Sequence, residues 1–168
     1  MYMQSAIDIH PQVPSSLNPF FHVELPLIVP GINESYMPGM NEDEKYTLIH
    51  TPAARQFLLQ AAWYFRDQAN IKKFDRRVFE AISESREKVP FDVTIKLHLK
   101  TLWKSDIDGP DKIIIDALFK HFVFLADVGL AHNWNDNRIV ALHVYKDVAL
   151  SGVPSIEIEV RCCVLSGK

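Results

Sequence analysis

An alternation of apolar and polar side chains between Phe91 and Lys100 is the sequence feature that most constrains the fold. This period of two predicts a β-strand with one buried face. From Ile113 to Phe122 the apolar residues recur at helical spacing instead, and Pro110 suits a first helical turn. The chain is therefore predicted to change from a strand to a helix just before Pro110.

Two carboxylates, Asp106 and Asp108, lie at this change of pattern. If the segment is still extended, both project from one face, roughly 6–7 Å apart, and a hard cation could bind beside them. Lys104 and Lys112 limit the local negative charge. The alternative is that the two aspartates only cap the following helix, which is the commoner role of an isolated Asp-x-Asp.

The remaining patterns predict an α+β fold, in which helices pack on one face of a mixed β-sheet. Residues 30–45 read as a loop. Helices are expected after the Thr51 cap and, with a second apolar period, through Phe74, Val78 and Ile82. Strands are expected at Phe20–Val29, Tyr46–His50, Ile139–Val148 and Ile156–Val164.

Length and composition are typical of one globular domain. Residues 1–19 read as a flexible tail, and residues 20–168 as the folded domain. No apolar run approaches the ~20 residues of a membrane span, and no secretory signal is visible. Cys162 and Cys163 are adjacent on an expected strand, so their side chains should point to opposite faces. We therefore expect reduced thiols in a soluble cytoplasmic protein with no membrane partner.

Further motifs follow in a definite order along the chain. The N-terminal turn contains Asn33 and Tyr36, the helix after Pro110 contains Asp116-Ala117-Leu118, Asp136 follows Trp134, and Lys146 lies on a later strand. In order and spacing, these motifs and Asp106 to Lys112 resemble the RusA family of Holliday junction resolvases. The resemblance spans roughly residues 23–164. The chain departs from the family pattern at Gly109, where Asn is usual, at Asn135, where a second Asp is common, and in a longer segment between Leu118 and Trp134.

This resemblance implies a RusA-like fold and a bacterial or phage-encoded, metal-dependent endodeoxyribonuclease of DNA recombination and repair. It implies a homodimer that presents two sites to branched DNA, the Holliday junction, and resolves it by paired phosphodiester hydrolysis. The expected metal site consists of Asp106, Asp108 and Asp136. Carboxylate oxygens favour Mg²⁺, with Mn²⁺ as a substitute. Lys112 occupies the family's catalytic-lysine position.

Phosphate contacts are expected from basic residues near this site. Lys96, Lys100 and Lys104 follow one side of the strand that leads to Asp106, and Lys146 could reach the same phosphate. The formal net charge of −3 makes such a local patch necessary for DNA binding. The alternative is that these lysines are only the solvated face of a strand.

The role of Asn33 and the function of the whole chain have alternatives as well. Asn33 could touch nucleic acid, or it could only form a turn. The spacing of Cys and His residues gives no support to a zinc site. For the whole chain, the competing functions are a catalytically inactive RusA-like DNA-binding protein and a structural protein in which the aspartates only cap a helix.

Overall fold

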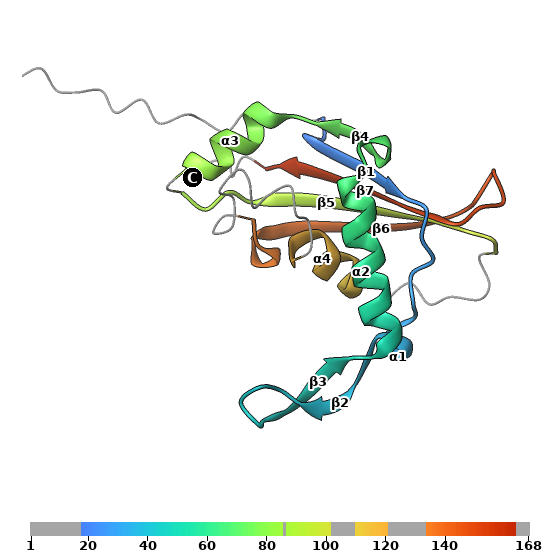
Figure 1. The fold of residues 1–168 in the computed structure, drawn as a ribbon. Helices are drawn as coiled ribbons and strands as arrows, with labels where there is room; N and C mark the ends of the chain where they lie inside the picture. Colours follow the sequence, from blue (N-terminus) through green and yellow to red (C-terminus); the bar gives the residue numbers. More distant parts are fainter. Residues whose placement is uncertain (1–17, 86, 102–109, 121–133, 164–168) are drawn as a thin grey trace, which may run out of the picture.

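The computed structural model describes residues 18–85, 87–101, 110–120 and 134–163, which form a mixed five-stranded sheet covered by helices (Figure 1). The strand order is β4-β1-β7-β5-β6. Strands β5 and β6 are parallel, and the other neighbours are antiparallel. The bounds are β1 Phe21–Leu25, β4 Ile71–Phe74, β5 Phe91–Leu99, β6 Ile139–Val148 and β7 Ser155–Cys162. The predicted α+β class with a mixed sheet is confirmed.

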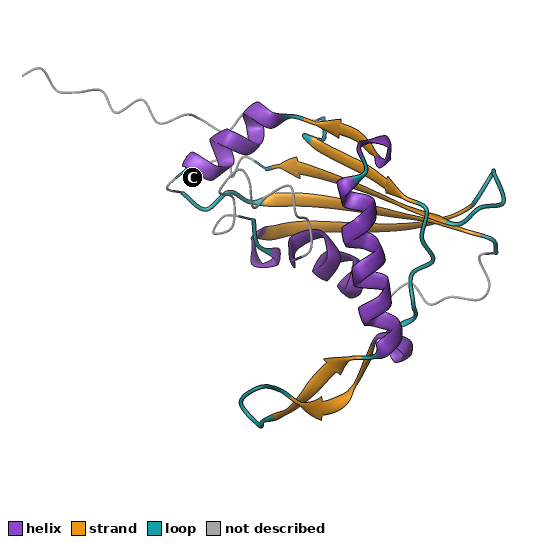
Figure 2. Cartoon of the chain, in the orientation of Figure 1, coloured by secondary structure: helices purple, strands orange, loops and turns teal. Residues whose placement is uncertain are grey.

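One face of the sheet is apolar because the alternating positions of β1, β5 and β7 all point their apolar side chains to the same side. Helices α2 (Pro52–Arg66), α3 (Arg76–Glu84) and α4 (Pro110–Lys120) add their buried side chains to the same core. Figure 2 shows α2 and α4 crossing this face. The opposite face carries the polar positions of the same strands.

Local capping fixes where two of these helices begin. The Thr51 side chain accepts a hydrogen bond from the backbone N–H of Ala54, and Pro52 occupies the first turn of α2, as the sequence predicts. The Asp75 carboxylate accepts hydrogen bonds from the backbone N–H groups of Arg77 and Val78 at the start of α3. Each cap satisfies donors that the helix itself leaves unpaired.

The expected loop at residues 30–45 is wrong for most of its length. It contains the short helix α1 (Ile32–Ser35) and the strand β2 (Tyr36–Met40), which pairs antiparallel with β3 (Tyr46–His50). Pro38 and Gly39 look like loop residues, yet a two-stranded ribbon has edges that tolerate proline. A Cβ atom on Gly39 would lie 2.3 Å from Ile49 Cδ1, so a larger residue there would force the Ile49 side chain to move.

A second expectation, that the helical pattern includes Phe74, is also wrong. Phe74 ends β4, which pairs with β1 at the edge of the sheet, and α3 begins only after Asp75. Strand pairing with β1 decides the conformation here, because tertiary contacts override a weak local periodicity. The 3₁₀ helix η1 (Gln68–Asn70) joins α2 to β4.

Three further expectations can be compared with this structure. Cys162 is buried, Cys163 is half-buried and both are free thiols. The predicted tail lies almost wholly outside the described residues. Among the described helices, none has the length and apolar character needed to cross a membrane.

Candidate functional site

A buried carboxylate on α4 forms the centre of a polar cluster, which we call the Asp116 cluster: Asp116, Tyr36, His50, Lys112 and Lys120. Only 5% of Asp116 is exposed. Its Oδ1 atom lies 2.6 Å from Lys120 Nζ, and its Oδ2 atom lies 3.0 Å from the Tyr36 hydroxyl and 3.3 Å from His50 Nε2. The burial of this charge is therefore compensated by hydrogen bonds from three residues.

These contacts keep Asp116 ionised. Burial by itself raises the pKa of Asp116, but the hydrogen bond and charge of Lys120, with hydrogen bonds from Tyr36 and His50, lower the pKa below its ordinary value. Burial, and next the negative charge of Asp116, strongly raise the pKa of Tyr36. The Tyr36 hydroxyl therefore stays protonated and donates a hydrogen bond to the Asp116 carboxylate.

Lys112 joins this cluster through the ring of Tyr36. Its Nζ atom lies 4.6 Å from the ring centroid, within the range of a cation–π interaction. The side chain is exposed and lies in the first turns of α4. An ammonium group is thus held near the positive end of a helix, where a bound anion would be favoured.

The two central aspartates of the predicted metal site, Asp106 and Asp108, lie outside the described residues, as does Lys104. Asp136 is described and exposed, and it begins the 3₁₀ helix η5 (Asp136–Arg138). Two residues earlier, the indole Nε1 of the buried Trp134 donates to the Leu118 carbonyl at 3.1 Å. This bond holds the segment that precedes Asp136 against the C-terminal half of α4.

Asp136 and Lys112 therefore lie toward opposite ends of α4, whose eleven residues span roughly 16 Å. The strand register agrees with this placement. Ile139, which closely follows Asp136, lies opposite Phe91 at the start of β5. The chain leaves β5 at Leu99, about 26 Å further along the strand. The structure brings Lys112 together with Tyr36 and Asp116, but it does not bring Asp136 to them within one chain.

The remaining predicted DNA contacts are dispersed. Asn33 is exposed on α1, Lys100 is exposed just after β5, and Lys146 is half-buried on β6. The surroundings of Lys96 are acidic, whereas the sequence predicts a basic face. Its Nζ atom lies 3.0 Å from Glu157 and 3.4 Å from Glu159 on the neighbouring strand β7.

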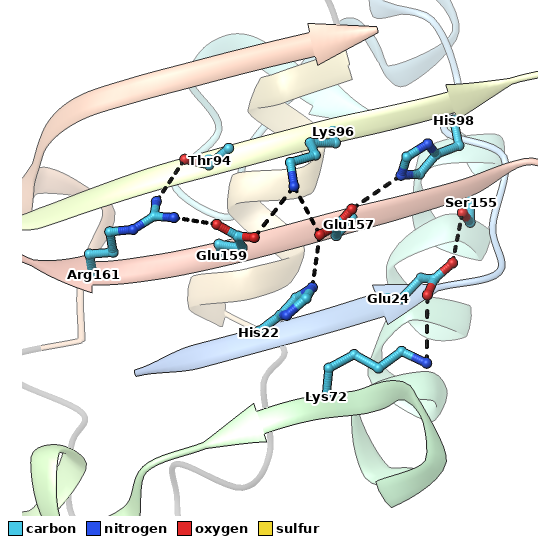
Figure 3. A network of polar contacts seen from close by, with 10 residues as sticks. All are labelled: His22, Glu24, Lys72, Thr94, Lys96, His98, Ser155, Glu157, Glu159 and Arg161. Carbon is cyan, nitrogen blue, oxygen red and sulfur yellow. Dashed lines mark hydrogen bonds and ion pairs between the residues drawn. The ribbon is translucent and has the colours of Figure 1, made fainter. Parts of the chain in front are cut away.

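Lys96 belongs to a polar network that covers the face of the sheet opposite the helices (Figure 3). His98 contacts Glu157 at 3.2 Å, His22 contacts it at 2.9 Å, and Arg161 pairs with Glu159. The predicted basic face is thus a surface of mixed charge, because β7 supplies glutamates directly beside the lysine of β5. Sequence periodicity identifies these residues as polar but does not reveal which strands are neighbours.

Within this network, one group could hold a metal ion. The ligand atoms of His22, Glu157 and Glu159 all lie within 4.8 Å of one another. Sequence reasoning missed this group because His22 and Glu159 become neighbours only through the pairing of β1 with β7. Lys96 contacts both glutamates, so an ammonium already supplies positive charge there.

We expect the network to make stability depend on acidity. Burial raises the pKa of Glu157, but hydrogen bonds from Lys96 and His98 outweigh it and lower the pKa below its ordinary value. A carboxyl group with a depressed pKa in the folded state stabilises the protein above its unfolded-state pKa, and this contribution is lost as the pH falls through the folded-state pKa. The free energy of unfolding should therefore fall from about pH 5 to about pH 3, and less steeply in Glu157→Gln.

Urea unfolding at a series of pH values measures this difference. Glu42→Gln, on the exposed turn between β2 and β3, is the matched control and should follow the parent protein. If Glu157→Gln and the parent lose the same free energy of unfolding over this range, Glu157 does not carry the effect.

Comparison with known proteins adds no relative: no protein-family model matches the chain, and no curated protein matches it at a significant level. The fold and the site together define an α+β protein with a polar cluster centred on Asp116 of α4 and a charged network on the open face of its sheet.

Proposed function

We propose that this protein is a metal-dependent endodeoxyribonuclease that cuts four-way DNA junctions, as its resemblance to the RusA family implies. The observation that supports this most is the meeting of two motifs in the Asp116 cluster. Tyr36 comes from the N-terminal turn motif, while Lys112 and Asp116 come from the helix motif, and the Tyr36–Asp116 hydrogen bond joins positions 80 residues apart. Motifs first recognised by their order along the chain thus contribute to a single cluster.

The donor chemistry of the predicted carboxylates suits a hard metal ion. Asp106, Asp108 and Asp136 would supply carboxylate oxygens, which Mg²⁺ and Mn²⁺ prefer, and Asp136 is solvent-accessible. When bound, such an ion activates a water molecule and neutralises charge that develops on the scissile phosphate.

In this proposal the other residues of the Asp116 cluster position the Lys112 side chain for the same reaction. The Tyr36 ring lies under the Lys112 ammonium, and the Tyr36 hydroxyl is fixed by Asp116. Asp116 is engaged by Lys120, Tyr36 and His50, so among the described residues of the cluster the Lys112 ammonium remains able to take an anion from outside. A non-bridging phosphate oxygen is such an anion, and a positioned cation stabilises the charge that grows on it in the transition state.

One observation favours a second candidate, a catalytically inactive relative that binds DNA or has a structural role. Lys96 is engaged by Glu157 and Glu159, so the face expected to bind phosphate is neutralised by carboxylates. The formal net charge of −3 also favours an inactive protein, because neutralisation of phosphates supplies much of the affinity for DNA.

A single-turnover assay on a synthetic four-way junction separates these functions. The parent protein should nick opposing strands when Mg²⁺ is present, should not do so in excess chelator, and should leave a linear duplex of the same sequence uncut. Junction binding without cutting, with either Mg²⁺ or Mn²⁺, would support the inactive relative. If the protein neither binds nor cuts the junction, both DNA-directed functions are contradicted and only the structural role is left.

A further inference from the structure

Two carboxylates on the open face of the sheet each present one oxygen to the same ammonium group (Figure 3). The Oε1 atoms of Glu157 and Glu159 lie 3.0 Å and 3.4 Å from Lys96 Nζ. The other oxygen of each carboxylate is held from outside. Glu157 Oε2 contacts His98 Nε2 at 3.2 Å, and Glu159 Oε2 accepts a hydrogen bond from Arg161. Both carboxylates are therefore oriented with their Oε1 atoms toward one cation.

An imidazole nitrogen adds a third donor to these two oxygens. His22 Nε2 lies 2.9 Å from Glu157 Oε1. The ligand atoms of His22, Glu157 and Glu159 all lie within 4.8 Å of one another, and within the described residues this is the one group of three or more such side chains with that geometry. Ligand atoms around a tetrahedral zinc ion are about 3.4 Å apart, so small side-chain movements bring all three to bonding distance.

Strand pairing holds these side chains in place. Strand β7 lies between β1 and β5, and all three are interior strands of the described sheet. The register places Glu159 opposite His22 on β1, and Glu157 opposite Lys96 on β5. Donors carried by paired strands are positioned more precisely than donors on a loop, so the set is arranged before an ion binds.

The position of Lys96 shows that this point attracts positive charge. Its ammonium contacts both Oε1 atoms, so it stands in for a cation bound to the same two oxygens. The Lys96 side chain is 37% exposed, against 18% for Glu157 and 14% for Glu159. The lysine can therefore turn toward water and leave the two carboxylates to another cation.

We propose that His22, Glu157 and Glu159 bind a divalent ion of the first transition series, such as Zn²⁺, which displaces the Lys96 ammonium. Imidazole nitrogen favours Zn²⁺ and related ions, whereas Mg²⁺ prefers ligands that are all oxygen. Three protein ligands leave one tetrahedral position for water or an external ligand. The spacing of His residues along the chain does not indicate this site, because strand pairing assembles it.

This ion is distinct from the one proposed for DNA cutting. Its ligands lie on the open face of the sheet, whereas Lys112 and Asp116 belong to α4 on the other face. The ion would link β1 to β7 and stabilise the folded chain, because the unfolded chain does not bring the three ligands together. The inference goes beyond the proposed function and does not depend on it.

Zinc titration of the full chain by calorimetry, in excess Mg²⁺ so that all-oxygen sites are filled, tests the site. His22→Gln should weaken the strongest Zn²⁺ site about 100-fold or more, since losing only an outer partner of a ligand already costs about 10–100-fold. His143→Gln is the matched control and should bind like the parent. His143 also contacts a carboxylate of the sheet, Asp92 at 3.4 Å, but it lies outside the group of ligands.

Lys96→Met separates a metal site from an ion-pair network that needs no metal. The variant removes the competing ammonium and keeps the apolar stem, so Zn²⁺ should bind on the order of 10-fold tighter. Without metal the variant should unfold at a lower temperature than the parent, and Zn²⁺ should raise its unfolding temperature more than the parent's. Lys100→Met, exposed just after β5, is the control and should bind Zn²⁺ like the parent.

Three results would overturn the proposal: a parent that binds no Zn²⁺, a His22→Gln variant that binds Zn²⁺ like His143→Gln, or a Lys96→Met variant that binds it no tighter than the parent. Glu159→Gln keeps the shape of the side chain and loses its charge, and it should lose the same ion. It replaces His22→Gln if that variant does not fold. No measurement uses DNA, so this site and the proposed nuclease function can fail separately.

Discussion

Replacing Asp108 with Asn should abolish Mg²⁺-dependent cutting of a four-way junction, while binding of the junction survives or tightens. The change removes a charged oxygen ligand that a hard cation prefers, and it also removes a negative charge close to phosphate. Single-turnover cutting and junction binding are measured on the same preparation. Asp43→Asn, on the exposed turn between β2 and β3, is the matched control and should cut like the parent. An Asp108→Asn variant that cuts at the parent rate would remove Asp108 from the proposed site.

The same assay with Asp136→Asn tests whether Asp136 belongs to the proposed metal site. Either substitution alone should be inactive. A fully active Asp136→Asn variant would exclude Asp136 from the site altogether.

Lys112→Ala should slow single-turnover cutting about 10²–10³-fold, the effect of removing one group that stabilises transition-state charge. The substitution should leave folding nearly unchanged, because Lys112 is exposed and its contact with the Tyr36 ring contributes only about 0.5–1 kcal/mol. Lys112→Arg should recover little of the rate, since a planar guanidinium does not replace a compact ammonium.

The control for this prediction is Lys88→Ala, an exposed lysine between α3 and β5. Thermal unfolding of both variants should match the parent within a few degrees, so that a lower rate reports on the reaction and not on folding. A Lys112→Ala variant that cuts within about threefold of the parent would contradict the charge-stabilising role given to Lys112.

Much of the fold follows from the sequence because the period of two and the helical period are local. Residues 91–99 and 155–162 alternate strictly, and each forms a strand with the expected face buried. Thr51 and Pro52 begin α2 as predicted. Prediction failed at β2 and β4, where short strands exist only because β3 and β1 lie beside them.

The candidate site divides in the same way. The sequence predicts that Lys112 and Asp116 lie on one helix, and the motif pattern identifies Tyr36 as part of the N-terminal turn motif. It does not show that Tyr36 and His50 meet Asp116, because this contact depends on the pairing of β2, where a loop is expected, with β3. Asp106 and Asp108 lie outside the described residues, so their convergence with Asp136 stays a prediction.

The sequence by itself determined most of the strands and helices and which of their faces are apolar, since those properties depend on residues a few positions apart. Only the tertiary structure decided that β7 lies between β1 and β5. That order puts Glu157 and Glu159 beside Lys96 and His22, so the predicted basic surface becomes one of mixed charge. It also leaves β6 at the edge. Strand order depends on contacts between residues far apart in the chain, and such contacts leave no periodic mark in the sequence.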